Sequence, residues 1–253
     1  MEHPRKNFNP MSPRFTRRAA HSRGFTLIEL AVVVTIIGIL AMLAFPQMGD
    51  AQRERHTYDD AGQILELVHN ARTRAMGRGA ATMVTFDTVT AGQTRGNYRM
   101  YEAVSPNPGG ANDNTARLPS ASCTFPIGGW APGSTTNTFI DGVTLNGTYE
   151  TAANITSRVV TFDNTGTPSV ASSVIALCFT PLGRTYYWSG GSGSTPQFSA
   201  AAPFMGTLAV DVVRLFQGQS TISASSTTGI TRRVLVPSSG NARIVSTMSP
   251  PAP

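Results

Sequence analysis

The pattern of hydrophobic and polar positions changes twice along the chain, and each segment predicts a different element. From Phe25 to Phe45 apolar residues are nearly continuous, enough for a helix that crosses about 30 Å of hydrocarbon. Over 47–79 apolar residues recur at spacings of three and four, which indicates an amphipathic helix. From 80 to 247 the pattern becomes strand-like. The chain therefore predicts an α+β protein whose long N-terminal helix packs on an antiparallel β-sheet head.

The two halves of this helix, 25–46 and 47–79, meet at Pro46, which has no N–H to donate and is expected to interrupt or kink the helix. The helix is expected to stop at Gly77 and Gly79. The face expected to pack on the head consists of Ala51, Arg55, Tyr58, Ala61, Leu65, Val68, Arg72 and Ala75. The residues expected to face water are Arg53, Glu54, Asp59 and Glu66.

The head contains short segments of strand-like composition, separated by stretches rich in Gly, Pro, Asn and Ser. Strands are expected at 81–88, 97–104, 138–145, 158–163, 173–180, 184–189, 205–216 and 230–236. The longest loops are expected at 105–137 and 189–203. The Pro-rich tail, 248–253, is expected to be disordered.

The positive charge is concentrated at the N-terminus. The net charge is +6, but six basic residues against Glu2 place +5 within 1–24, and 14 Arg against 13 acidic residues leave +1 for the remainder. A basic flank on an apolar helix predicts that 1–24 lies in the cytoplasm and the head lies across the membrane. Only 13% of residues are charged and 40% are hydrophobic, which excludes an acidic disordered chain and a charged coiled coil.

Three interpretations of the apolar run compete. A secretory signal peptide requires small residues at a cleavage site after its core, and 41–46 offers a poor one. A plain signal anchor explains the hydrophobicity and the basic flank, but it leaves Gly24 and Glu29 unexplained. The third interpretation must account for Glu29, because a carboxylate in an apolar segment costs several kcal/mol unless it is paired or protonated.

The segment Gly24-Phe25-Thr26-Leu27-Ile28-Glu29 resembles the prepilin peptidase site of type IV pilins and type II secretion pseudopilins. The resemblance implies that the peptidase removes 1–24 by cutting after Gly24 and then methylates Phe25. It implies a single-pass protein of the bacterial inner membrane with a periplasmic head, which later joins other pilins in a pilus or pseudopilus.

The new α-ammonium at Phe25 would lie at the positive end of the helix dipole and would need a counter-charge. Glu29 is one turn into the helix and is expected to supply that charge to the Phe25 of a neighbouring subunit, which would fix the register of the assembly. The alternative is that Glu29 reaches lipid headgroups at the membrane surface.

Parts of the head resemble the GspH/FimT group of minor pilins and pseudopilins, namely Leu67–Met76 followed by Thr82–Phe86, and the closing segment Arg232–Ile244. This resemblance implies a structural subunit that primes or caps a type IV pilus or a type II secretion pseudopilus. The alternative is a pilus-tip subunit that binds DNA for uptake. Its candidate phosphate contacts are Arg232, Arg233 and Arg243, although a mature charge of +1 argues against it.

Cys123 and Cys178 are the two cysteines, and outside the inner membrane they could form a disulfide or remain buried free thiols. No CxxC, HExxH, GxSxG or P-loop motif is present. His56 and His69, the histidines that follow the leader, fall on different faces of the helix. These observations predict a protein that is not an enzyme and that needs neither a metal nor a cofactor.

Overall fold

A computed structural model describes residues 25–88, 95–104, 120–124, 137–145, 155–191, 194–198, 203–216, 219, 222–223 and 225–248. The leader 1–24 with Gly24, nearly all of loop 105–137 and tail residues 249–253 lie outside the described residues. The chain forms two compact units, Met1–Met48 and Gly49–Pro253. Each unit is described by itself.

Helix α1 (Leu27–Arg78) is one element of 52 residues that contributes to both units. It ends at Gly79, whose φ of 67° is the left-handed conformation that terminates many helices. The helix continues through Pro46, so the expectation that it is interrupted there is wrong. Proline removes one backbone hydrogen bond, and the turns on either side carry the helix past it. A kink at Pro46 stays a prediction.

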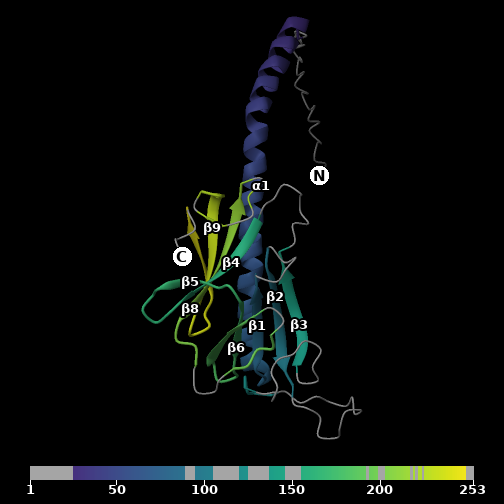
Figure 1. Cartoon of the computed structure of the whole chain (residues 1–253). Coiled ribbons are helices and arrows are strands. Elements are labelled where there is room, and N and C mark those ends of the chain that lie inside the picture. Colours follow the sequence, from purple (N-terminus) through teal and green to yellow (C-terminus); the bar gives the residue numbers. More distant parts are fainter. Residues whose placement is uncertain are drawn as a thin grey trace, which may run out of the picture. The chain divides into compact units, whose positions relative to one another are not determined.

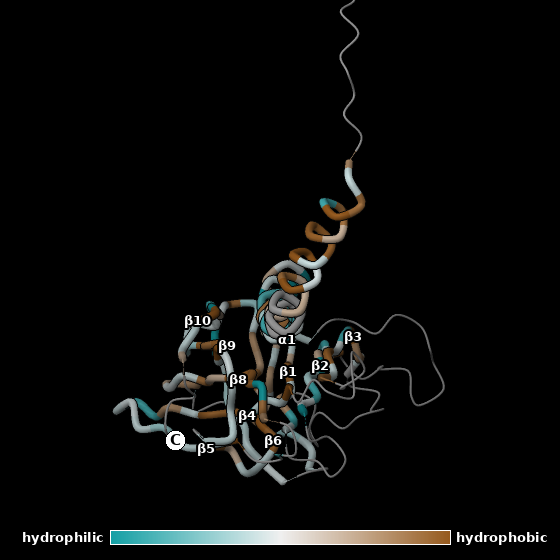
Figure 2. The backbone as a smooth tube through the Cα atoms, turned by 90° about the horizontal axis from the view of Figure 1, so that it is seen from above, coloured by the Kyte–Doolittle hydropathy of each residue, from teal (hydrophilic) through white to brown (hydrophobic). Residues whose placement is uncertain are grey.

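The N-terminal part of α1 exposes its apolar residues. Leu27 is 86% exposed and Ile36 is 52% exposed, and Figure 2 shows this part of the helix as a mainly hydrophobic stretch. Within the described part of the chain, no helix meets the combined length and hydropathy of a membrane span.

Ten strands of the second unit form two five-stranded antiparallel sheets (Figure 1). The first sheet has the order β3 (Asn137–Thr144), β2 (Asn97–Ala103), β1 (Thr82–Asp87), β6 (Val174–Phe179) and β7 (Thr185–Gly190). The second has the order β10 (Arg243–Thr247), β9 (Thr227–Pro237), β8 (Thr207–Leu215), β4 (Ile155–Phe162) and β5 (Pro168–Val170). The expected class, α+β with a helix on antiparallel sheets, is confirmed.

Eight of these strands coincide with the expected segments, with ends that differ by a few residues. The other two, β5 and β10, lie at the two edges of the second sheet and were not among the expected strands. Each is short and has few buried positions, so neither has the hydrophobic signal on which strand prediction depends. The pairing of β10 with β9 agrees with the resemblance of 232–244 to a closing strand pair.

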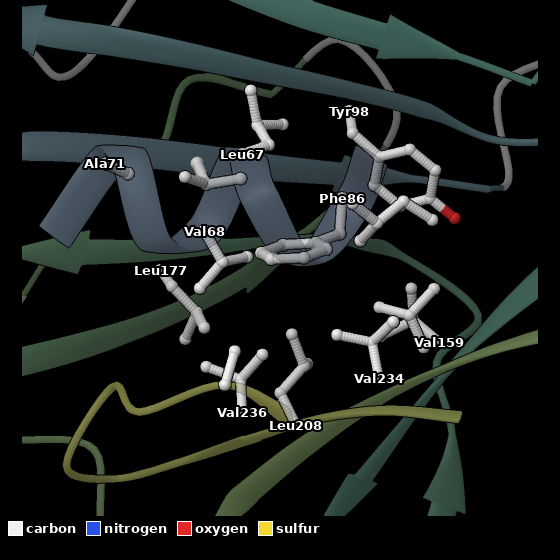
Figure 3. Close-up of a cluster of buried hydrophobic side chains, with 14 of the residues drawn as sticks. Leu67, Val68, Ala71, Phe86, Tyr98, Val159, Leu177, Leu208, Val234 and Val236 are labelled. Carbon is white, nitrogen blue, oxygen red and sulfur yellow. The ribbon is translucent and has the colours of Figure 1, made fainter. Parts of the chain in front are cut away.

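The core lies between the C-terminal half of α1 and the inner faces of both sheets. Figure 3 shows Val68 of the helix close to Phe86 and Leu177 of the first sheet, with Leu208 and Val236 of the second sheet beyond them. All of these side chains are buried. The helix is therefore a structural part of the head, and both sheets need it to cover their inner faces.

The packed face of α1 differs in part from the expected one. The fully buried aliphatic positions Ala61, Ile64, Val68, Ala71 and Ala75 follow each other at spacings of three and four. Ala61, Val68 and Ala75 also belong to the expected face. In place of Ile64 and Ala71, the expected face contained Leu65 and Arg72, which are half-buried at its rim. The helical period fits both sets equally well, so only the contacts decide between them.

The expectations for other residues of α1 are also wrong. Ala51, Arg55 and Tyr58 were placed on the packed face but are exposed. Glu54 was placed in water but is half-buried, and its Oε1 accepts a hydrogen bond from the backbone N–H of Ile230 at 3.0 Å. Its long side chain reaches Gly229 of β9, which lies near an irregularity in the pairing of β8 with β9 and has a φ of 75°. A Cβ at Gly229 would lie 1.8 Å from that Oε1 atom.

A second apolar cluster covers the outer face of the first sheet. One row of directly paired residues crosses all five strands: Phe139, Tyr101, Met83, Cys178 and Tyr186. A disulfide joins Cys178 to Cys123, with their Cα atoms 5.9 Å apart. The bridge holds the segment Ser120–Thr124 against this face, where Cys123 is also buried.

We expect thiol labelling of the protein from the cell envelope to find no free cysteine under denaturing, non-reducing conditions. Reduction should lower the free energy of unfolding of the head by about 2–4 kcal/mol, because the bridge limits the unfolded chain. Chemical denaturation with and without reductant measures this difference. Two labelled thiols per chain would contradict the prediction.

Candidate maturation and assembly site

The start of α1 presents the residues on which maturation and assembly are expected to depend. Phe25 precedes the helix and is 80% exposed. Thr26 is the N-cap, and its Oγ1 accepts a hydrogen bond from the backbone N–H of Glu29 at 3.3 Å. Its carbonyl accepts the first helical bond, from the N–H of Leu30 at 3.2 Å. The helix therefore begins two residues after Phe25, at Leu27, with a capped first turn.

Thr26 was missed as a functional residue, although Thr26-Leu27-Ile28-Glu29 has the T-x-x-E spacing of a capping box. The acidic Glu29 also favours the positive end of the helix dipole. Glu29 thus has a role in its own helix besides the expected pairing with another subunit. Its side chain is exposed, and among the described residues of this chain its carboxylate has no partner.

The three arginines considered for DNA binding do not form one surface. Arg232 lies on the inner face of β9, where its guanidinium stacks 5.5 Å from the ring centroid of Tyr58. Arg233 is buried and lies on the opposite face. Arg243 is exposed and pairs with Leu235, on the same face as Arg233. Only Arg243 is freely exposed to a phosphate.

Arg233 instead belongs to an ion network at the centre of the second sheet. Its Nε and Nη2 atoms donate to the two oxygens of Asp211 at 2.5 and 2.8 Å. Arg158 on β4 donates to the same carboxylate at 3.0 Å. Asp211 is fully buried, so its charge depends on these two guanidinium groups. Because Arg233 is engaged in this buried pairing, we do not assign it a role in DNA binding.

Polar contacts also attach the C-terminal half of α1 to the sheets. Glu102 on β2 is buried and pairs with Arg74 and with Arg78, the second at 3.2 Å between Nε and Oε1. On the second sheet, the carbonyl of Ala242 lies 2.9 Å from Nε2 of His69. These partners are far apart in the chain, and nothing in the local sequence pattern indicated that they would meet.

Asp60 is a half-buried carboxyl group on α1, and burial raises its pKa from 3.8 to about 6. The charge of His56 opposes this rise in pKa, and the charge of Asp59 adds to it. The charge of Asp60 in turn contributes to raising the pKa of Tyr98 on β2. Because the folded state prefers the protonated acid, the contribution of Asp60 to stability is fully present below pH 3.8 and is lost as the pH rises through about 6.

We expect Asp60→Asn to stabilise the head at pH 7 by about 1–2 kcal/mol, after allowance for solvent screening. At pH 3.5 the substitution should have little effect, because the wild-type carboxyl group is then neutral in both states. Chemical denaturation across this pH range measures the difference, with Glu66→Gln, an exposed residue of the same helix, as control. A gain that is the same at both pH values would contradict the prediction.

Comparison with known protein families finds a match in the N-terminal segment. Residues 20–45 match the prokaryotic N-terminal methylation motif. The matched range contains Gly24, Phe25 and Glu29. No curated protein and no solved structure matches the chain. Among the residues described, no group of three His, Cys, Asp or Glu side chains is arranged to hold a metal ion. The motif supports a type IV pilin-like prepilin.

Proposed function

We propose that this chain is a structural minor pilin or pseudopilin of the GspH/FimT kind, with no catalytic role. Prepilin peptidase cleaves it after Gly24 and methylates Phe25. The mature chain is held in the inner membrane by the apolar part of α1, with its head in the periplasm. It then assembles with other pilins, where it primes or caps a type IV pilus or a type II secretion pseudopilus.

The observation that carries this proposal is the match of 20–45 to the methylation motif. The geometry of the same segment is in agreement, because the helix begins two residues after Phe25 and Thr26 caps it. The exposed apolar residues that follow are suited to burial in lipid first and against neighbouring helices later. Glu29 is available there to a partner's N-terminus.

Removal of the leader and methylation of Phe25 test the proposal. In cells that contain prepilin peptidase, mass spectrometry should find the chain without residues 1–24 and with a methyl group on the amine of Phe25. Gly24→Val should keep the leader, because a bulky side chain next to the scissile bond does not fit a site built for glycine. Gly38→Val is the matched control, since a Cβ at Gly38 meets no atom within 4 Å. A wild-type chain that keeps its leader in these cells would refute the proposal.

A further inference from the structure

The head has an open cleft beside the disulfide. It has a volume of about 770 Å³ and lies between the segment Ser120–Thr124 and the turn Thr180–Arg184. Small-molecule sites in proteins commonly span roughly 300–1,000 Å³. The cleft is therefore large enough for a ligand of two or three rings.

Both walls of the cleft are braced from within. The hydroxyl groups of Ser122 and Thr124 bond to each other at 2.8 Å. In the opposite wall, the backbone N–H of Arg184 donates to Oγ1 of Thr180 at 3.1 Å. The disulfide from Cys123 to Cys178 fixes the first wall to strand β6. Covalent and hydrogen-bonded supports thus fix the local shape of each wall.

Other polar groups that line the cleft remain available to a ligand. Arg184 is exposed, and among the described residues of the lining it is the one charged side chain and no carboxylate accompanies it. Within the described residues its guanidinium forms no ion pair, and the hydroxyl groups of Ser120 and Tyr186 have no hydrogen-bond partner. The lining also includes the apolar surfaces of Pro181 and Leu182.

We propose that this cleft binds an acidic saccharide. The Arg184 guanidinium would take the sugar carboxylate through two parallel hydrogen bonds. The hydroxyl groups of Ser120 and Tyr186 bind ring hydroxyls, and Pro181 and Leu182 offer an apolar surface to the C–H face of a sugar. A single cation suits one carboxylate, whereas a nucleic-acid backbone requires several phosphate contacts. The inference does not depend on how the chain is processed or assembled.

Ligand-observed saturation-transfer NMR on the full chain in detergent micelles tests this proposal. Two matched pairs differ in the acidic group: trigalacturonic acid against its methyl ester, and 3′-sialyllactose against lactose. We expect the acidic member of at least one pair to bind more tightly than its neutral partner. Arg184→Gln should weaken that binding about ten-fold or more, as the loss of a charged hydrogen-bonded pair does. The control Arg243→Gln removes an exposed arginine outside the cleft and should change nothing.

The disulfide that attaches one wall of the cleft to β6 supplies a second test. Joint replacement of Cys123 and Cys178 by Ser should weaken binding of the same saccharide, while near-ultraviolet circular dichroism shows whether the head remains folded. The proposal is overturned if no acidic saccharide binds better than its neutral partner. It is equally overturned if Arg184→Gln binds as tightly as wild type. Leader processing is read separately by mass spectrometry, so failure here leaves the proposed pilin function untouched.

Discussion

We expect Glu29→Ala to leave removal of the leader efficient but to lower incorporation into filaments by about two orders of magnitude. Cleavage should survive because the scissile bond lies five residues before Glu29. Assembly should fail because the α-ammonium of a neighbouring Phe25 would lie unpaired in an apolar bundle. Loss of one partner of a buried ion pair typically costs about 3–5 kcal/mol. The measurement compares processed chain in membranes with chain recovered in sheared filaments.

Glu29→Gln is the control that separates charge from helix capping. Glutamine keeps the T-x-x-Q form of the capping box with Thr26 but removes the negative charge. If the charge fixes assembly, the Gln variant should fail as the Ala variant does. If the Gln variant enters filaments as well as wild type, Glu29 acts through its own helix, and intersubunit pairing is refuted.

Asp211→Ala should destabilise the head by about 3–5 kcal/mol, because it leaves two guanidinium groups in a largely buried site without their counter-charge. The exposed Asp59→Ala is the control and should change the free energy of unfolding by less than about 0.5 kcal/mol. Chemical denaturation of both variants measures the difference.

A triple variant tests the cause. Replacing Arg158, Asp211 and Arg233 together by Met, Leu and Leu should recover most of the lost stability, since apolar residues of similar volume can replace a buried ion network at little cost. A loss below about 1 kcal/mol in Asp211→Ala would show that the network contributes little to the fold.

The elements were predictable from the sequence where hydrophobic periodicity is strong. The long helix and eight strands have such a pattern. The two edge strands β5 and β10 lack it, because most of their residues remain in contact with solvent. The choice between Ile64 and Leu65 on the helix face was beyond the sequence as well, since both fit a period of 3.6.

The candidate site was predictable in part for a related reason. Gly24, Phe25 and Glu29 lie within six consecutive residues, so a local motif identifies them. The partners of Arg233 and Glu54 are distant in the chain: Asp211 is on another strand, and Ile230 is 176 positions from Glu54. Only tertiary packing brings such groups together, and it changed Arg233 from a candidate DNA contact into a structural residue.

The order of the strands has a consequence for how the head folds. The chain builds β1–β3 in the first sheet, β4 and β5 in the second, β6 and β7 again in the first, and β8–β10 in the second. Neither sheet can be completed from one continuous stretch, and β1 must wait for β6, about ninety positions later, to pair with it. Domains dominated by such distant contacts fold slowly, in about milliseconds to seconds. As the chain is synthesised, β1 therefore keeps one edge open until residues up to 179 are available to pair with it.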